Sequence, residues 1–155
     1  MGRAPVKTEM PAWAGASRLI LCHVHRSSSR TLFLRHATGS VIAPAPLPFL
    51  STVLEEGEYD AEDLAVFAHP AALARDYCAR SGLEPSLLQA EGGFQQRVDA
   101  PGGIITVYLA RFTCIDPPSG LFSADGGKFC AITELRGGHP AEMALLQRAY
   151  QTIIG

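Results

Sequence analysis

The stretch PAALARDYCARSGL, residues 70–83, predicts one well-defined helix and is the part of the sequence that decides the fold. It opens with a proline at a plausible first helical position, where a missing N–H costs nothing, and Gly82 follows after about three turns. Asp76, Ala79 and Arg80 are spaced so that their side chains share one flank of this helix. The sequence therefore predicts a helix with these three side chains along one flank.

This helix resembles the helical half of the Nudix box, the motif of hydrolases that act on nucleoside diphosphate derivatives. The motif reads Arg-Glu-x-x-Glu-Glu-x-Gly-apolar, and its positions fall on Arg75, Asp76, Ala79, Arg80, Gly82 and Leu83. Arg75, Gly82 and Leu83 match by identity, and Asp76 keeps an acid. The resemblance implies an α+β fold, with a mixed β-sheet sandwiched between α-helices over residues 18–155.

Most of the acids that such a motif needs for a divalent cation are missing here. Ala79 and Arg80 stand where two of them are expected, and a guanidinium repels Mg²⁺. Asp76 and Arg80 are instead spaced for an (i, i+4) ion pair, worth about 0.2–0.5 kcal/mol at a surface. Counting back along the motif, its glycine falls on Ala61 and its earlier glutamate on Phe67. We therefore expect little or no Mg²⁺- or Mn²⁺-dependent hydrolysis, with Asp76 as the one remaining catalytic candidate.

Three arginines are candidates for contact with a phosphorylated ligand. Arg35 ends a predicted strand, at the place where Nudix domains carry a basic residue near the substrate cleft, and Arg75 and Arg80 lie on the helix. A guanidinium presents a planar fork of donors that suits phosphate oxygens. We expect these side chains to meet a nucleotide or another phosphorylated small molecule. The alternative is that Arg75 and Arg80 are surface residues paired with Asp76 and neighbouring acids.

An acidic segment, EEGEYDAED at residues 55–63, precedes the helix. Clustered carboxylates can bind Mg²⁺ or Mn²⁺, so the alternative to a binding domain is a divergent, metal-dependent Nudix hydrolase. Its candidate metal ligands are Glu55, Glu56, Glu58, Asp76 and Glu91. A solvated loop is the simpler interpretation, because no calcium-loop spacing is present. A third hypothesis is a protein-interaction module that uses the same scaffold without a small ligand.

Hydropathy patterns predict the strands that surround this helix. Residues 18–25, RLILCHVH, and 31–36, TLFLRH, form two apolar segments joined by a polar turn, which is typical of an antiparallel hairpin. Residues 39–54 contain three prolines and favour a rigid extended loop or an edge strand. Residues 103–116, GIITVYLARFTCID, are rich in β-branched and aromatic side chains, so we expect them at the centre of the sheet.

Four further segments complete the predicted layout. Residues 64–68, LAVFA, and 128–135, KFCAITEL, are expected to be strands. Residues 84–103 are expected to form one strand or an irregular segment, broken at Gly92-Gly93 and again at the following Pro-Gly-Gly. Residues 139–155 carry apolar side chains at i, i+3, i+4 and i+7 behind a proline, which predicts an amphipathic helix packed on the sheet.

Length and composition fit one domain, since 155 residues with 47% hydrophobic content can bury a sizeable core. Residues 1–17 are expected to be a tail or lead-in segment, from which Trp13 could dock on the domain. The net charge of −2 gives no electrostatic basis for bulk nucleic-acid or membrane binding. No apolar run reaches the roughly 18 residues of a transmembrane helix, and we expect a cytoplasmic protein with its four cysteines reduced. The sequence leaves the oligomeric state open.

Overall fold

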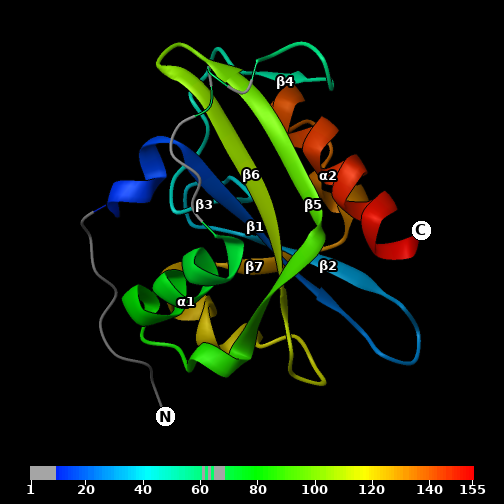
Figure 1. The fold of residues 1–155 in the computed structure, drawn as a ribbon. Helices are drawn as coiled ribbons and strands as arrows, with labels where there is room; N and C mark the ends of the chain where they lie inside the picture. The colour runs from blue at the N-terminus through cyan, green and yellow to red at the C-terminus, as the bar shows by residue number, and fades with distance from the viewer. Residues whose placement is uncertain (1–9, 61, 63, 65–68) are drawn as a thin grey trace.

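The computed structural model describes residues 10–60, 62, 64 and 69–155. Within these residues the fold is a mixed sheet of seven strands flanked by two α-helices, as predicted (Figure 1). The strands follow the order β4-β5-β6-β1-β2-β7, and β3 pairs with β1 off this path. The helices cover opposite faces of the sheet, so the domain has three layers.

The elements agree closely with the strongest sequence patterns. The strands are β1 Ser17–Val24, β2 Thr31–Arg35, β3 Ile42–Ala43, β4 Thr52–Leu54, β5 Leu88–Ala100, β6 Gly103–Phe112 and β7 Lys128–Cys130. The helices are α1 Pro70–Ser81 and α2 Pro140–Ile154. β1 and β6 run parallel at the centre of the sheet, and the other pairs are antiparallel, including the predicted β1–β2 hairpin.

Both helices begin in the same way. The Nδ1 atom of His69 accepts the N–H of Ala71 at 3.2 Å, and the Nδ1 atom of His139 accepts the N–H of Ala141 at 3.1 Å. In each case a proline follows the histidine, where no intrahelical N–H bond is needed. Gly82 ends α1 with φ of 70°, a left-handed conformation that glycine adopts without a Cβ clash.

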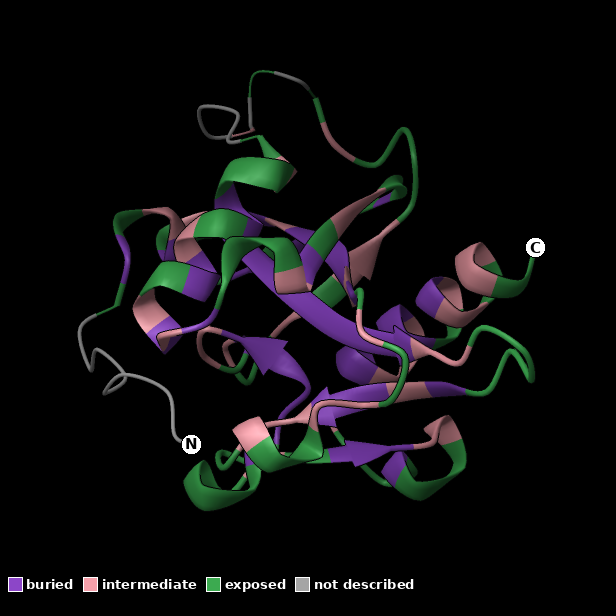
Figure 2. Cartoon of the chain, turned by 90° about the horizontal axis from the view of Figure 1, so that it is seen from below, coloured by how far each residue is buried: buried purple, intermediate pink, exposed green. Residues whose placement is uncertain are grey.

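Alternation along the strands divides the core into two layers. Ile20 and Phe33 face α2 and pack in one cluster with Leu145, whereas Leu19 faces α1 and packs with Leu73. Figure 2 shows buried residues along the strands and on the inner sides of both helices. Each fully buried side chain of this kind contributes roughly 1.5–3 kcal/mol, so both helices are held mainly by apolar burial.

The segment after α1 differs from its prediction. β5 continues through Gly92-Gly93 instead of breaking there. Glu91 lies opposite Leu109 and Gln95 lies opposite Tyr108, so the residues between Glu91 and Gln95 form a bulge in one continuous strand. Phe94 in this bulge is 2% exposed and packs in the core that faces α2. Its burial explains why the two glycines bend the strand without ending it.

Three further segments lie at the chain ends and in the loops. Only Lys128–Cys130 of the predicted strand at 128–135 is extended, and Ile132–Leu135 forms a 3₁₀ turn. Residues 10–17 pack on the domain, because Ala12–Gly15 forms a 3₁₀ turn with Ala14 buried and β1 already begins at Ser17. The strand predicted at 64–68 lies mostly outside the described residues.

Two general features concern the described part of the chain. Neither α1 nor α2 has both the length and the apolar character that a bilayer crossing requires. The thiols of Cys22, Cys78, Cys114 and Cys130 are free, and all but Cys114 are buried.

Candidate functional site

Helix α1 holds Asp76 in contacts that occupy its carboxylate. Oδ2 of Asp76 accepts the indole N–H of Trp13 at 2.7 Å and the Nε–H of Arg80 at 2.8 Å. The side chains of Asp76 and Arg80 are 37% and 29% exposed. The predicted (i, i+4) pair is therefore present, and Trp13 docks on the helix that carries the family-like motif. The only acid at the motif positions balances a positive charge of the protein itself.

The two other motif positions within Pro70–Ser81 face the solvent. Arg75 and Ala79 are both exposed on the outer side of the helix. Arg75 makes no hydrogen bond or ion pair with any residue that the structure describes. Its predicted pairing with neighbouring acids is therefore not seen within the described chain.

Arg35 lies on the other face of the sheet. It ends β2 two residues after Phe33, whose ring packs against α2, so the Arg35 side chain points toward the same layer. There it lines a hollow of about 230 Å³ at the start of α2, together with Arg136, Gly137 and Gly138. The structure therefore places Arg35 apart from the two arginines of α1, so the three side chains expected to meet a phosphorylated ligand do not lie together.

The two acids that line this hollow are already bonded to neutral donors. Glu142 is 8% exposed, and its carboxylate accepts the Ser40 hydroxyl at 2.7 Å and the Val41 N–H at 3.3 Å. Glu134 accepts the N–H of Ala131 at 2.8 Å. Glu142 also sits in the first turn of α2, where the helix dipole favours a negative charge. Both acids therefore have a structural role.

The basic residues around the hollow have no such partners. Within the described chain, Arg35 and Arg136 make no hydrogen bond or ion pair through their guanidinium groups. Lys128 lies directly opposite Arg35 in the β2–β7 register and adds a third positive charge nearby. The hollow can therefore accept an anion without displacing a protein carboxylate from either arginine. Arg136 could not be identified from sequence, because it belongs to no motif and only follows a short 3₁₀ turn.

His36 follows Arg35 and is neutral at physiological pH. Burial lowers the pKa of its imidazole to about 4. Its Nε2 atom is buried and finds no hydrogen-bond partner among the residues described, although the side chain as a whole is partly exposed. His36 therefore adds no positive charge to the three basic side chains around the hollow.

The candidate metal ligands are dispersed over the fold. Asp76 lies on α1, whereas Glu91 lies opposite Leu109 on the α2 face and pairs with Arg111 at 2.9 Å. Glu55 is ion-paired with Arg148 at the end of β4. In the described part of the chain, no three His, Cys, Asp or Glu side chains are grouped so that they could hold a metal ion.

Two candidate ligands from the acidic segment lie beside Glu55. Glu58 accepts the backbone N–H of Glu55, which closes a short turn, and Glu56 lines a pocket at the edge of the sheet. Residues 61 and 63 of this segment lie outside the described residues. Glu55 and Glu58 therefore have local partners, whereas Glu56 has no partner among the residues described.

Comparison of the sequence with models of known protein families and with curated proteins finds no match. The resemblance of residues 70–83 to the Nudix box therefore stays a prediction from the sequence.

Proposed function

We propose that this chain is a Nudix-like domain that binds a nucleotide or another phosphorylated small molecule, with little or no pyrophosphohydrolase activity. The observation that carries the proposal is the hollow at the start of α2. Its two arginines, Arg35 and Arg136, have no partner in the described chain, while its two acids are bonded elsewhere. Two guanidinium groups without a paired acid in the described chain favour an anionic ligand.

The size of the hollow favours the phosphate end of such a ligand. A volume of about 230 Å³ is below the roughly 300–1,000 Å³ of typical small-molecule sites, so the rest of the ligand would extend over the surface. Two guanidinium groups can donate paired hydrogen bonds to phosphate oxygens. The N–H groups of Gly137 and Gly138 are further donors, because neither is bonded to a described residue.

The state of α1 supports binding without hydrolysis. Metal-dependent cleavage of a diphosphate needs a cation that activates water and neutralises the developing charge. Here Asp76 is bonded to Trp13 and Arg80, and no neighbouring motif position supplies a second carboxylate. A cation at this helix would have to displace both donors while remaining close to a guanidinium.

The binding proposal is tested by titrating the full chain with a nucleoside monophosphate, a nucleoside diphosphate and a nucleotide sugar, in the presence of a chelator. We expect a dissociation constant on the order of 0.1–1 mM for at least one of them, followed by amide NMR shifts. Arg35→Gln and Arg136→Gln should each weaken binding about tenfold, since a charge-assisted bond contributes roughly 1.5 kcal/mol or more. Arg30→Gln, on the exposed β1–β2 turn, is the matched control and should leave the affinity unchanged.

The absence of hydrolysis is tested separately with Mg²⁺ and Mn²⁺. Calorimetry should detect no submillimolar metal site, and the same three ligands should remain intact on incubation with metal and protein. Metal binding that is lost in Asp76→Ala or Glu56→Gln, together with turnover, would support the divergent hydrolase instead. A chain that binds neither metal nor any phosphorylated ligand would favour the protein-interaction module.

A further inference from the structure

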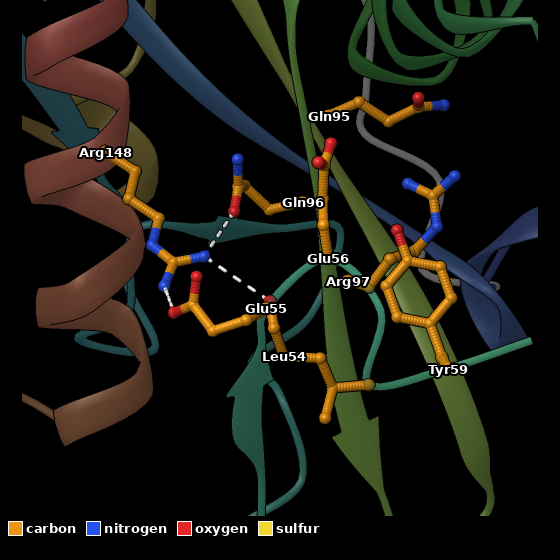
Figure 3. A pocket seen from close by; sticks show the side chains of 8 residues that line it. All are labelled: Leu54, Glu55, Glu56, Tyr59, Gln95, Gln96, Arg97 and Arg148. Atoms are coloured by element: carbon orange, nitrogen blue, oxygen red, sulfur yellow. Dashed lines mark hydrogen bonds and ion pairs between the residues drawn. The ribbon is translucent and has the colours of Figure 1, made fainter.

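A separate pocket opens at the edge of the sheet, where β4 ends (Figure 3). β4 pairs with β5 only from Thr52 opposite Asp99 to Leu54 opposite Arg97. Beyond Leu54 the chain leaves the sheet, so side chains from β5, α2 and the following loop surround the uncovered edge. The resulting pocket measures about 440 Å³ and lies apart from the hollow around Arg35, with which it shares no lining residue.

One wall of this pocket is fixed by Arg148 of α2. Its Nη1 donates to Oε1 of Gln96 at 2.6 Å and to the backbone carbonyl of Leu54 at 3.4 Å, and its Nη2 bonds the carboxylate of Glu55. These contacts join α2 to the end of β4 and to β5, as the dashed lines in Figure 3 show. The guanidinium of Arg148 is therefore largely occupied by the protein.

The opposite wall presents an arginine with no acceptor. The guanidinium of Arg97 lies over the ring of Tyr59, 5.6 Å from its centroid, and both side chains lie on the other side of β5 from Arg148 (Figure 3). Nε of Arg97 is buried, and no residue that the structure describes accepts a hydrogen bond from any of its N–H groups. The side chain is otherwise partly exposed and has no paired acid among the residues described, so its guanidinium is available to an anionic group.

The other charges in the pocket select the kind of anion. Arg148 is paired with Glu55, so within the described chain the unpaired charges that line the pocket are those of Arg97 and Glu56. The uncompensated carboxylate of Glu56 repels a doubly charged phosphate more strongly than it repels a singly charged carboxylate. Glu56 has no partner among the described residues, and it can accept hydrogen bonds from a ligand that carries hydroxyl or ammonium donors.

We propose that this edge pocket binds a small carboxylate that also carries a hydroxyl or ammonium group, such as a hydroxy acid or an amino acid. The ligand carboxylate bonds the free edge of the Arg97 guanidinium, which the Tyr59 ring holds flat from one face. The hydroxyl or ammonium group bonds Glu56 and the side-chain carbonyl of Gln95. This site is independent of the phosphorylated ligand proposed above.

The test is an NMR titration of the full chain at constant ionic strength with glycolate, serine, acetate and inorganic phosphate. Glycolate or serine should give saturable shifts of the amides of Gln95, Gln96 and Arg97, with an affinity several-fold tighter than that of acetate or phosphate. Arg97→Gln should weaken binding about tenfold, because it removes the charged donor. Glu56→Gln, at an exposed position, should weaken serine more than acetate and provides a second variant if the first does not fold.

Two matched variants separate this site from the hollow at α2. Arg136→Gln should leave glycolate and serine binding unchanged, and Arg97→Gln should leave nucleotide binding unchanged. The proposal is overturned by the absence of saturable shifts, by shifts that persist in a folded Arg97→Gln variant, or by phosphate binding more tightly than either carboxylate. A comparison of glycolate with serine then distinguishes a hydroxy acid from an amino acid as the preferred ligand.

Discussion

The two helices on either side of the sheet use their carboxylates in different ways. On α1, Asp76 is 37% exposed at its side chain and balances Arg80 while it accepts the indole N–H of Trp13. On α2, Glu142 is 8% exposed and bonds only the neutral donors of Ser40 and Val41. The acid of α1 therefore pairs with a neighbouring arginine, whereas the acid of α2 forms no ion pair with Arg35 or Arg136. A count of acids and bases in a region therefore does not show which arginines can bind a ligand, because that depends on which of them are already paired.

The largest effect is expected from removing the buried acid. Glu142→Ala should lower the free energy of unfolding by about 2–3 kcal/mol, because the Ser40 hydroxyl and the Val41 N–H would lose their acceptor in a buried site. Urea denaturation measures the change. Glu134→Ala is the control at the same hollow, where the side chain is exposed, and should cost less than about 1 kcal/mol. Equal losses in the two variants would contradict the structural role assigned to Glu142.

The next largest effect is a pH dependence of the free energy of unfolding, caused by His36. The folded pKa of His36 is lowered to about 4 from an ordinary value near 6.5, so between these values the unfolded chain binds the additional proton. The His36 contribution is complete above pH 6.5 and is lost as the pH falls toward 4. The full shift corresponds to about 3 kcal/mol, and partial exposure of the residue reduces the expected loss to roughly 1–2 kcal/mol.

Denaturation curves recorded from pH 7.5 to pH 4 measure this contribution. The His36→Asn variant should show a weaker dependence over the same interval, because it removes the titrating group. A parent protein with the same pH profile as the variant would show that His36 is protonated as readily in the folded state as in the unfolded one.

A smaller effect is expected from the contact that joins the N-terminal turn to α1. Trp13→Phe keeps an apolar ring but removes the indole donor, so it should cost about 1 kcal/mol at this partly exposed site. Asp76→Asn removes the charge of the acceptor, and the double variant completes a mutant cycle. Coupling between the two positions of a few tenths of a kcal/mol or more is expected. Strictly additive losses would mean that the bond contributes nothing to stability.

The smallest effect is expected at the ion pair of α1. Arg80→Gln should change the free energy of unfolding by about 0.5 kcal/mol or less, as is usual for an exposed (i, i+4) pair. Thermal denaturation at low and high salt should show that this small difference decreases as salt increases. A loss as large as that of Glu142→Ala would remove the contrast between the two helices.

Local patterns were sufficient for most of the architecture. A histidine-proline start precedes both helices, Gly82 ends the first of them, and the β-branched run of Gly103–Phe112 lies at the centre of the sheet. β5 was not predictable in the same way, because the glycines within it favour a break while burial of Phe94 in a distant core keeps the strand continuous. A contact made across the fold outweighed a local preference.

The candidate site was less accessible from sequence than the fold. The ion pair of Asp76 and Arg80 followed from helical spacing alone. The side of the sheet on which Arg35 lies follows from strand alternation, because Arg35 is two residues after Phe33 and therefore points to the same side as Phe33. Arg136 and Arg97 could not be identified from sequence. An arginine is a candidate ligand-binding residue only if no nearby acid pairs with it, and whether an acid does so depends on residues that are distant in the chain.

The contact between Trp13 and Asp76 also determines what an optical measurement on this protein reports. The chain contains a single tryptophan, and its indole is bonded to a carboxylate 63 residues further along the chain. Intrinsic fluorescence excited at the indole band therefore follows the attachment of the N-terminal turn to α1. If that turn detaches before the sheet opens, the emission signal and far-ultraviolet circular dichroism will give different midpoints for the same denaturation.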